Sequence, residues 1–584
     1  MFSYLQFRYR RSWRRLRRDT RLIARWGQNY INRHIWGKWH QVRLVRRFLL
    51  VWWLLIAVSA VGLLQQLGGL QRVASRVVAA SGGTYIEAAV GDVQGINPIL
   101  PDSAASTDIS RLIFSGLTRY NSLRQIVPDL ATWDVSNDGK TYTFHLRHGV
   151  KWHDGVPFSS ADVAFTLTAI QNPDSRSPLA SSWQGVNFET QGDDTIVIKL
   201  PQPLNSFLDS TTVGILPRHL LESVDPTTLR EAEFNQNPVG TGPFKMKTFA
   251  PAAKTIELEA NPDYYLGRPR LAEFDFKLYD TSTDALNAFA QHQVTSPGRL
   301  MPEDLGQDVA GDAHLTNYPM TLPEEKVLFF NAENKLLSDK TLRQILSRSL
   351  NRDEIVSRAS GGQAIALTQP LLPGQLGYTN KYALPSLDQA TAKSALENAG
   401  WALPHGATAR VKDGAKLQFT LVTLEGGELS AAANEVKRQW APLGIELTVK
   451  TVPRDQLQQT YMRPRNFQML LYGVNLGSDP DVYSFWHSSQ AKDPGVNLSQ
   501  YNSADADRAL ETARIKSDAS VRQGKYDAFL KAWNTDAPAA VLYQQGYVYA
   551  TRDTATGIKA HRLVSPADRF YDIQRWTVLQ RFTR

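Results

Sequence analysis

Hydrophobic and polar positions alternate in several short stretches of the chain, as they do in strands with one buried face. Residues 84–90, TYIEAAV, follow this period of two, and so do the stretches on either side of Asn-Asp-Gly at 137–139. That tripeptide between alternating stretches predicts a β-hairpin. Residues 107–120, TDISRLIFSGLTRY, have the period of a helix, and we expect Thr107 or Asp108 to cap it.

A different order of patterns occurs later in the chain. The strand-like residues 417–423 are followed by a helical period at 430–444 and by a second strand-like stretch at 445–452. Strand, helix and strand in this order predict a parallel βαβ unit. Sheets built in this way bind ligands in a crevice beyond the ends of their strands. The pattern therefore predicts an α/β protein with a crevice.

Residues 150–167, VKWHDGVPFSSADVAFTL, place Trp, His and Asp in a row and raise the question of an active site. The apolar positions around them suit a strand, a turn at 154–155 and a helix that begins near Ser159 or Ser160. No nucleophile is paired with His153. We therefore interpret it as a histidine with a structural hydrogen bond and not as a catalytic base.

The composition narrows the chemistry further. The 584 residues include no cysteine, which excludes disulfides, thiolate metal sites, a thiol nucleophile and a lipid attached to cysteine. No HExxH, GxSxG or clustered metal ligands occur, and GTGPF at 240–244 lacks the Lys-Ser/Thr of a phosphate-binding loop. We therefore expect a tight turn at 240–244, no enzymatic activity, no cofactor and no metal site.

The net charge of +9 is unevenly distributed. Residues 1–47 hold 14 Lys and Arg and a single acid, Asp19, whereas the other residues hold 51 basic and 55 acidic side chains. Residues 48–64, FLLVWWLLIAVSAVGLL, have no charge and as a helix would rise about 26 Å, close to a hydrocarbon core. We predict a membrane anchor at 48–70, with the basic head 1–47 in the cytoplasm and the body outside it.

Two features of this end of the chain leave alternatives open. A cleaved signal peptide competes with the anchor, because VVAAS at 77–81 has small residues, but that site lies far beyond the apolar run. The head combines arginines with tryptophans, a mixture found in segments that lie on anionic lipid, in unstructured topology signals and in nucleic-acid binders. We favour the anchor over cleavage, and the membrane over nucleic acid.

Residues 130–167, LATWDVSNDGKTYTFHLRHGVKWHDGVPFSSADVAFTL, resemble the signature of the family 5 extracellular solute-binding proteins, the receptors of peptide, nickel and related ABC importers. Together with later stretches in the family's order, they extend the resemblance over residues 83–584 and leave the first 80 residues outside it. The further stretches are NPVGTGPFKMKTF (237–249), ANPDYYLGRPRL (260–271), LFFNAENKLLSDKTLRQILSRSLNRDEIV (328–356), DQATAKSALENAGW (388–401) and SDPDVYSFWHSSQ (478–490).

The resemblance implies a two-lobed α/β fold of the periplasmic-binding-protein-like type II, preceded here by one transmembrane helix. A hinge that the chain crosses twice would join the lobes, and we place the crossings near 320–328 and 536–543. The expected divisions are a linker at 71–82, lobe one at 83–325 with an inserted subdomain at about 121–240, lobe two at 326–540 and a return to lobe one at 541–584.

In the peptide-binding members of that family, a strand before an Asp-Pro pair runs along the ligand, and an aspartate three residues before the pair grips the peptide's amino terminus. Here the strand is 469–475, the pair is Asp479-Pro480, and the position of the gripping aspartate is Leu476. Leucine cannot pair with an ammonium group. Either another acid reaches in, or the amino terminus lies elsewhere, or the solute is not a free peptide.

The resemblance also implies which residues line the crevice. We expect Asp479 to have a structural role in a turn. A loop of lobe one is expected to face the strand of lobe two, and two tryptophans are candidates for ligand platforms, although we favour core packing for each. The candidate ligand-binding residues are Leu100, Pro101, Asp102, Ser103, Trp183, Tyr472, Val474, Asn475, Leu476, Gly477 and Trp486.

These expectations lead to one function and one alternative. The chain is expected to be a single-pass protein of the cell membrane and the solute-binding component of an ABC importer. It would capture an extracellular oligopeptide or similar extended solute by lobe closure and deliver it to the permease, while the ATPase subunits consume ATP. The alternative is a signalling receptor built on the same fold. The predicted partners are thus a small solute, the permease and ATPase subunits, and the membrane through 48–70, with no nucleic acid.

Overall fold

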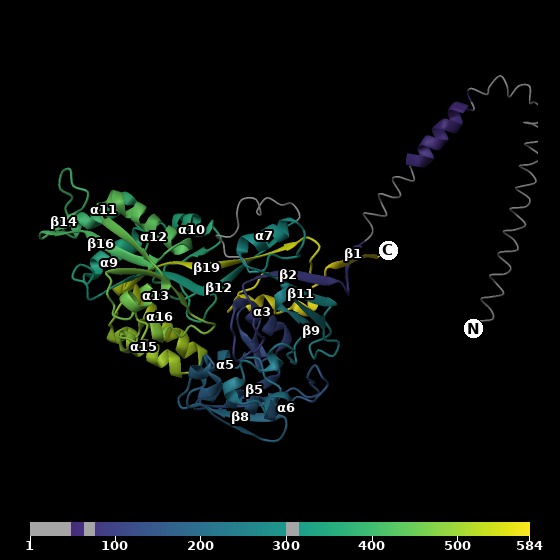
Figure 1. The fold of residues 1–584 in the computed structure, drawn as a ribbon. Helices are drawn as coiled ribbons and strands as arrows, with labels where there is room; N and C mark the ends of the chain where they lie inside the picture. The colour runs from purple at the N-terminus through teal and green to yellow at the C-terminus, as the bar shows by residue number, and fades with distance from the viewer. Residues whose placement is uncertain (1–47, 49, 63–75, 300–314, 584) are drawn as a thin grey trace, which may run out of the picture. The chain divides into compact units, whose positions relative to one another are not determined.

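The computed structural model describes residues 48, 50–62, 76–299 and 315–583, which belong to two units. In the first unit, residues 48 and 50–62 are helical and their apolar side chains are exposed (Figure 1, purple helix). Among the residues described here, no helix combines the length and the apolar content needed to cross a membrane. The predicted head, and parts of the predicted anchor and linker, lie outside the described residues.

The second unit, residues 79–580, begins with a four-stranded sheet in which the predicted strand 84–90 is confirmed. This strand is parallel to its neighbour, and the other two pairs are antiparallel. In spatial order the strands are β2 (Thr84–Val90), β11 (Glu273–Tyr279), β10 (Thr255–Ala260) and β9 (Phe244–Ala250), and the helices that pack against them are α3 (Ala104–Ile113) and α7 (Ser282–Ala290).

An antiparallel sheet follows and contains the predicted hairpin. Its first two strands flank the turn at 137–139, where Gly139 has a left-handed φ of +70°, so the hairpin prediction is confirmed. In spatial order the strands are β5 (Ala131–Val135), β6 (Thr141–Leu146), β8 (Thr195–Lys199) and β7 (Asn187–Thr190), with α4 (Ser160–Gln171) against them and the short hairpin β3 (Thr118–Tyr120) and β4 (Ile126–Pro128) before them.

The helix predicted over 107–120 was placed wrongly. The helix α3 begins earlier, with Ser103 as its cap in place of the two predicted caps, and it ends at Ile113. The chain then passes directly over another backbone, since a Cβ on Gly116 would lie 2.7 Å from the carbonyl carbon of Thr212. The local apolar period continues past this point, but the close approach of two chain segments decides where the helix stops.

A six-stranded sheet with helices on both faces forms the other half of this unit. The predicted βαβ unit is confirmed, because β16 and β17 are parallel and α12 joins them. In spatial order the strands are β13 (Ile365–Ala366), β19 (Ala539–Arg552), β12 (Leu315–Phe330), β18 (Met469–Asn475), β16 (Gln418–Leu424) and β17 (Glu446–Val452). One face packs on α9 (Lys340–Arg348), α10 (Arg352–Ser360), α11 (Gln389–Asn398) and α12 (Gly427–Trp440), and the other on α15 (Ala504–Ile515) and α16 (Ala519–Asp536).

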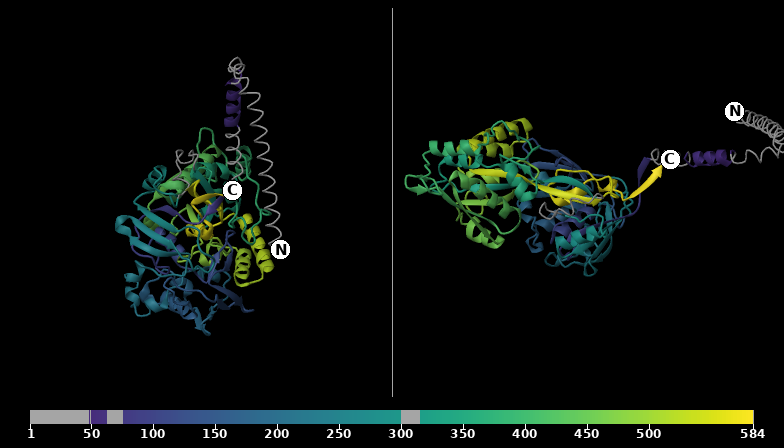
Figure 2. Two further views of the ribbon diagram at one scale, coloured as in Figure 1. Left: turned by 90° about the vertical axis from the view of Figure 1, so that its right-hand side faces the viewer. Right: turned by 90° about the horizontal axis from the view of Figure 1, so that it is seen from above.

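The long strands β12 and β19 run from one half of this unit into the other (Figures 1 and 2). On β12, Met320 belongs to the core of the first half and Phe330 to that of the second. On β19, Tyr549 belongs to the core of the first half and Val541 to a core of the second. We call lobe one the described residues 79–322 and 546–580, and lobe two residues 327–543.

The remaining elements are short. Two strand pairs are β1 (Arg76–Ala80) with β20 (Leu579–Thr583) and β14 (Val411–Lys412) with β15 (Ala415–Lys416). The short helices are α5 (Phe207–Ser210), α6 (Arg218–Leu221), α13 (Arg454–Gln456) and α14 (Tyr483–Trp486).

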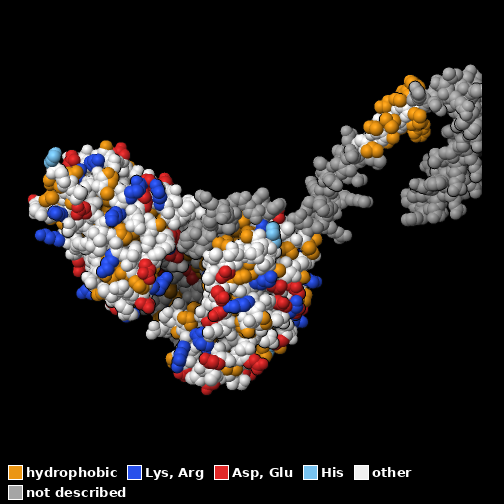
Figure 3. Space-filling view, turned by 45° about the horizontal axis from the view of Figure 1, so that its top comes forward, with side chains coloured by type: hydrophobic (Ala, Val, Ile, Leu, Met, Phe, Trp, Pro, Cys, Tyr) orange, Lys and Arg blue, Asp and Glu red, His pale blue; other side chains and the backbone are white. Residues whose placement is uncertain are grey.

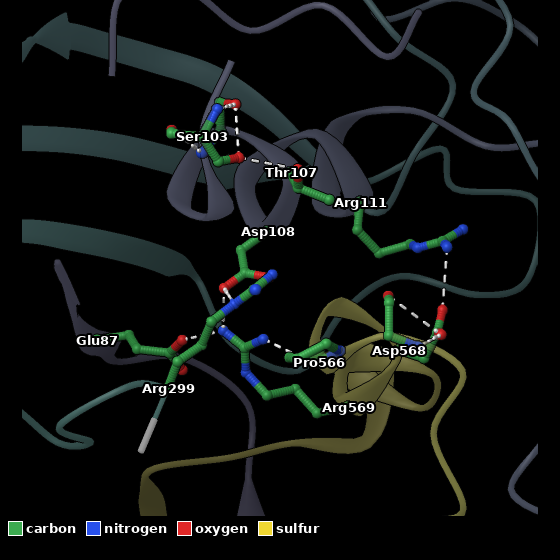
Figure 4. A network of polar contacts seen from close by, with 11 residues as sticks. Glu87, Ser103, Thr107, Asp108, Arg111, Arg299, Pro566, Asp568 and Arg569 are labelled. Carbon is green, nitrogen blue, oxygen red and sulfur yellow. Dashed lines mark hydrogen bonds and ion pairs between the residues drawn. The ribbon is translucent and has the colours of Figure 1, made fainter. Parts of the chain in front are cut away.

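A buried network of charges fixes the last part of the chain inside lobe one (Figure 4). Arg569 has no exposed surface and forms ion pairs with Glu87 of β2 and, at 2.8 Å, with Asp108 of α3. Arg299 forms a second ion pair with Asp108. Burial alone would raise the pKa of Asp108, but the two guanidinium groups outweigh it and lower that pKa. Each charge in the network is therefore neutralised by an opposite charge that comes from a distant part of the sequence.

Candidate functional site

The surface is hollowed between the two lobes (Figure 3). A cavity of about 330 Å³ lies there, and side chains of both lobes line it. We call it the cleft cavity. Its polar lining residues include Arg124, Asn205, Asp209 and Arg562 of lobe one, and Ser478, Asp479 and Arg522 of lobe two.

Asp209 of the short helix α5 reaches across the cleft. Its carboxylate accepts hydrogen bonds from the hydroxyl of Tyr120 in lobe one, at 3.1 Å, and from the hydroxyl of Ser478 in lobe two. Burial raises the pKa of Asp209 to about 6, because the hydrogen bonds that favour its charged form do not fully compensate for the loss of water. This acid is therefore half-buried, in contact with both lobes, and titrates close to neutral pH.

A second contact from the same segment joins lobe one to another part of lobe two. The Asn205 side-chain amide donates to the backbone carbonyls of Arg514, at 2.8 Å, and Lys516, at 2.7 Å. These bonds involve neutral groups, and each is partly accessible to water. Residues 205–209 thus hold two separate segments of lobe two through contacts that water can replace.

The turn after β18 is held by ion pairs within lobe two. Arg522 of α16 pairs with Asp479 at 2.6 Å, and Arg514 of α15 pairs with Asp481 at 3.1 Å. The guanidinium of Arg522 also donates to the carbonyl of Ala513 at 3.0 Å. Asp479 thereby anchors the turn against two helices, which is the structural role expected of it.

The strand β18 leads directly into this turn and has one edge that is only partly paired. Along one edge it pairs with β12 over its whole length. On the other edge it pairs with β16 only at Met469 and Leu470. Within the part of the chain that the structure describes, residues 472–475 therefore have no strand partner on that edge. An edge of this kind can accept an added extended chain.

The candidate residues on and after β18 divide into two groups. Val474 and Leu476 are buried in the core of lobe two, whereas Tyr472 is half-buried and Asn475 is exposed. The Asn475 side chain accepts a hydrogen bond from the backbone of Gly477 at 2.8 Å, and Gly477 faces Asp209. Of these candidates, Gly477 is the one that approaches a residue of the cleft cavity, whereas Val474 and Leu476 are part of the core.

Trp486 does not line the cleft. It has no exposed surface and packs at 5.6 Å between ring centroids from Trp533 and at 5.8 Å from Phe329. The prediction of a ligand platform at this position is corrected, because the tryptophan fills the core of lobe two. Its apolar environment could not be recognised from an aromatic residue in the sequence alone.

Some of the candidate residues of lobe one lie close together, and the others do not. Pro101 and Trp183 line a second cavity of about 400 Å³, and Asp209 borders this cavity as well as the cleft cavity. Leu100 is buried in the core, Ser103 caps α3, and Asp102 is exposed and accepts a hydrogen bond from the backbone of Gln94 at 3.2 Å. Pro101 and Trp183 thus lie together beside Asp209, but Trp183 is only 1% exposed and packs in the core of lobe one, as Trp486 does in lobe two.

The Trp-His-Asp sequence at 152–154 has a structural role, as predicted for His153. The Nδ1 atom of His153 accepts a hydrogen bond from the backbone of Gly240 at 3.1 Å, and Nε2 lies 3.1 Å from the carbonyl of Gly242. Burial lowers the pKa of this histidine to about 4. The neutral ring therefore fastens the turn at 240–244. In the described residues, no group of His, Asp and Glu side chains is arranged to hold a metal ion.

Several cleft residues were missed by the sequence analysis. Arg124, Asn205 and Arg562 lie outside helices and Asp209 lies in the four-residue helix α5, and neither a hydrophobic period nor a motif marks them. A larger hollow of about 730 Å³ lies within lobe two, but residues of that lobe alone line it. We take the cleft as the candidate site because groups from both lobes converge there.

Comparisons with known proteins agree with this geometry. The sequence model of the family described as bacterial extracellular solute-binding proteins, family 5 Middle, matches residues 125–495. The oligopeptide-binding protein AppA of Bacillus subtilis is 31% identical over 524 residues, which are 85% of this chain and 91% of AppA.

Two solved structures are similar over most of the chain. The structure of AppA from Bacillus subtilis in complex with a nonapeptide has a TM-score of 0.65 and 28% identity, and the match covers 86% of this chain and 100% of that one. The structure of NikZ from Campylobacter jejuni in complex with Ni(L-His) has a TM-score of 0.65 and 26% identity, with 85% and 99% covered. These similarities confirm the predicted two-lobed α/β fold.

Proposed function

The chain belongs to the bacterial extracellular solute-binding proteins of family 5, and from this premise we propose that it captures an oligopeptide or a similar extended solute in the cleft between its lobes. Proteins of this family bind solutes for transport and are not enzymes. The observation that carries the proposal is the free edge of β18 at 472–475, which leads into the cleft cavity. A solute that pairs with this edge contributes main-chain hydrogen bonds, and these do not depend on its side chains.

Closure of the lobes would complete the site. The strands β12 and β19 connect the two cores, so a change of their twist would move one lobe against the other. The contacts of Asn205 and Asp209 with lobe two join the lobes directly, and they would bias the lobes toward the closed arrangement. A solute that contacts both lobes shifts this equilibrium further in proportion to its preference for the closed form.

The missing acid at Leu476 has a candidate replacement. Asp209 comes from the opposite lobe and reaches Ser478, two residues beyond Leu476. This supports the first of the three alternatives, in which a different acid reaches into the site. A cationic group of the solute would then meet a carboxylate that already lies in the cleft.

Delivery to an ABC permease and attachment to the membrane are the finer parts of the proposal. The relatives support the first, since proteins in this family serve as the binding components of transporters. The uncharged run at 48–64, the basic residues before it and the exposed apolar side chains of the described helix support the second. We propose that this segment tethers the body on the outer side of the membrane, close to the permease.

Native mass spectrometry of the full chain, purified in mild detergent, tests the capture of an extended solute. We expect the protein to carry a series of peptide masses, because recognition through the main chain tolerates many sequences. A single discrete small molecule bound in place of this series would contradict the peptide part of the proposal. Failure to retain any solute, either from the cell or from an added peptide mixture, would contradict the binding role.

A further inference from the structure

Arg124 is held in an unusual position at the edge of the cleft cavity. It lies in the turn between β3 and β4 with a left-handed φ of 67°, a conformation that is uncommon for residues other than glycine. Only 6% of it is exposed, and its guanidinium donates to the carbonyls of Leu563, at 2.8 Å, and Thr321, at 3.1 Å. Within the described part of the chain, no carboxylate lies within ion-pair distance of it.

Arg562 brings a second positive charge to the same cavity. Its side chain crosses from lobe one to lobe two and lies on Gly374, since a Cβ at that glycine would be 1.8 Å from the guanidinium. No described carboxylate forms an ion pair with Arg562 either. Burial, and next the charge of Arg562, lower the pKa of Arg124 to about 10. The two arginines are therefore close enough for their charges to repel.

The acids that line the cavity are engaged elsewhere. Asp479 is paired with Arg522 at 2.6 Å. Asp209 accepts hydrogen bonds from two hydroxyl groups, one from each lobe. Among the described residues, the two guanidinium groups of the cleft cavity thus have no carboxylate at ion-pair distance. Arg124 is buried whereas Arg562 is exposed. Burying a charge without a partner is costly, so an anion bound between them would relieve that cost at Arg124.

We propose that Arg124 and Arg562 form a subsite for an oxyanion of the solute, either a carboxylate or a phosphate group. This inference rests on the solute-binding role proposed above and names the chemistry of one end of the solute. Guanidinium groups suit such anions because they donate several hydrogen bonds in one plane. Since Arg562 touches lobe two, an anion bound here would also strengthen the closed arrangement of the lobes.

The test uses the full chain in mild detergent and three single substitutions. Arg562→Gln removes an exposed charge, and Arg124→Gly removes the other charge while it suits the left-handed backbone. Arg268→Gln is the matched control, because Arg268 is an exposed arginine of lobe one that does not line the cavity. A cooperative thermal unfolding transition, measured for each variant, is the check that the variant folds.

Each protein is incubated with two random nonapeptide libraries, one with free carboxyl termini and one isotope-labelled with amidated termini. Retained masses are compared by native mass spectrometry. The wild type and the control should retain the carboxylate library about tenfold better than the amide library. This ratio should fall toward one in Arg562→Gln and Arg124→Gly.

Inorganic phosphate, compared with chloride at equal ionic strength, is the second probe. An increase in melting temperature that the two cavity variants lose and the control keeps would support the subsite with phosphate as its anion. If both libraries bind equally to all four proteins and phosphate has no effect, the solute-binding role stands and the oxyanion subsite is overturned. If neither the peptides nor phosphate bind, both proposals fail.

Discussion

The buried network around Arg569 and the contacts of Asp209 across the cleft use similar chemical groups for opposite purposes. In lobe one, Arg569 has no exposed surface and pairs with two carboxylates. In the cleft, Asp209 is half-buried and meets hydroxyl groups instead of a guanidinium. A fully paired buried network is costly to open, whereas contacts to neutral groups near water break and form easily. The first region maintains the fold, and the second suits the lobe closure proposed above.

The largest effect is expected from breaking the buried network. Replacement of Arg569 with leucine leaves Glu87 without its cationic partner and Asp108 with only Arg299. We expect a loss of about 3–5 kcal/mol in the free energy of unfolding, measured by urea denaturation of the full chain. The exposed residue Arg268 offers the control, since Arg268→Leu should change this free energy by no more than about 0.5 kcal/mol. Equal effects of the two substitutions would remove the contrast between the regions.

A smaller effect, seen in the arrangement of the lobes, is expected from Asp209→Ala. Loss of its hydrogen bonds to lobe two should favour the open arrangement by about 1 kcal/mol, or a factor of about five. Because the chain has no cysteine, Glu231→Cys in lobe one and Lys437→Cys in lobe two allow specific spin labels on exposed positions. Electron–electron distance measurements should show a larger share of long distances in the Asp209→Ala protein. An unchanged distance distribution would show that the contact does not bias closure.

The smallest effect concerns pH and has opposite signs in the two regions. The pKa of Asp209 is raised from an ordinary value of 3.8 to about 6, so its contribution to stability is full below 3.8 and is lost as the pH rises through 6. The pKa of Asp108 is lowered, so its contribution is present at neutral pH and is lost in acid. The melting temperature of the wild type relative to Asp209→Asn should therefore fall as the pH rises from 4 to 7. A difference that is constant or that rises with pH would refute the assignment.

Much of the secondary structure followed from local patterns. The strand at 84–90, the hairpin around 137–139 and the parallel unit between 417 and 452 were all predicted from hydrophobic periods and turn residues. The helix at 107–120 was not, because the packing of Gly116 against Thr212 ends it early. A local hydrophobic period reflects which side chains of a segment are buried, but it contains no information about a second backbone segment that passes nearby.

The candidate site was predicted less completely than the fold. Gly477 lies near Asp209, the turn that follows β18 lines the cleft cavity, and Pro101 meets Trp183 beside Asp209. Trp183 and Trp486 are both enclosed in hydrophobic cores. An aromatic residue suits a core and a ligand platform equally well, so its type alone could not distinguish the two positions.

The strands and helices with clear periods, the uncharged run at 48–64 with its basic residues, and the family could all be inferred from the order of residues. That Arg124 and Arg562 share a cavity, and that Asp209 faces Ser478, became apparent from the folded chain alone. A period depends on neighbours within a few residues, whereas these pairs are separated by hundreds. Their proximity depends on the order of strands in the sheets and on the passage of β12 and β19 between the two cores.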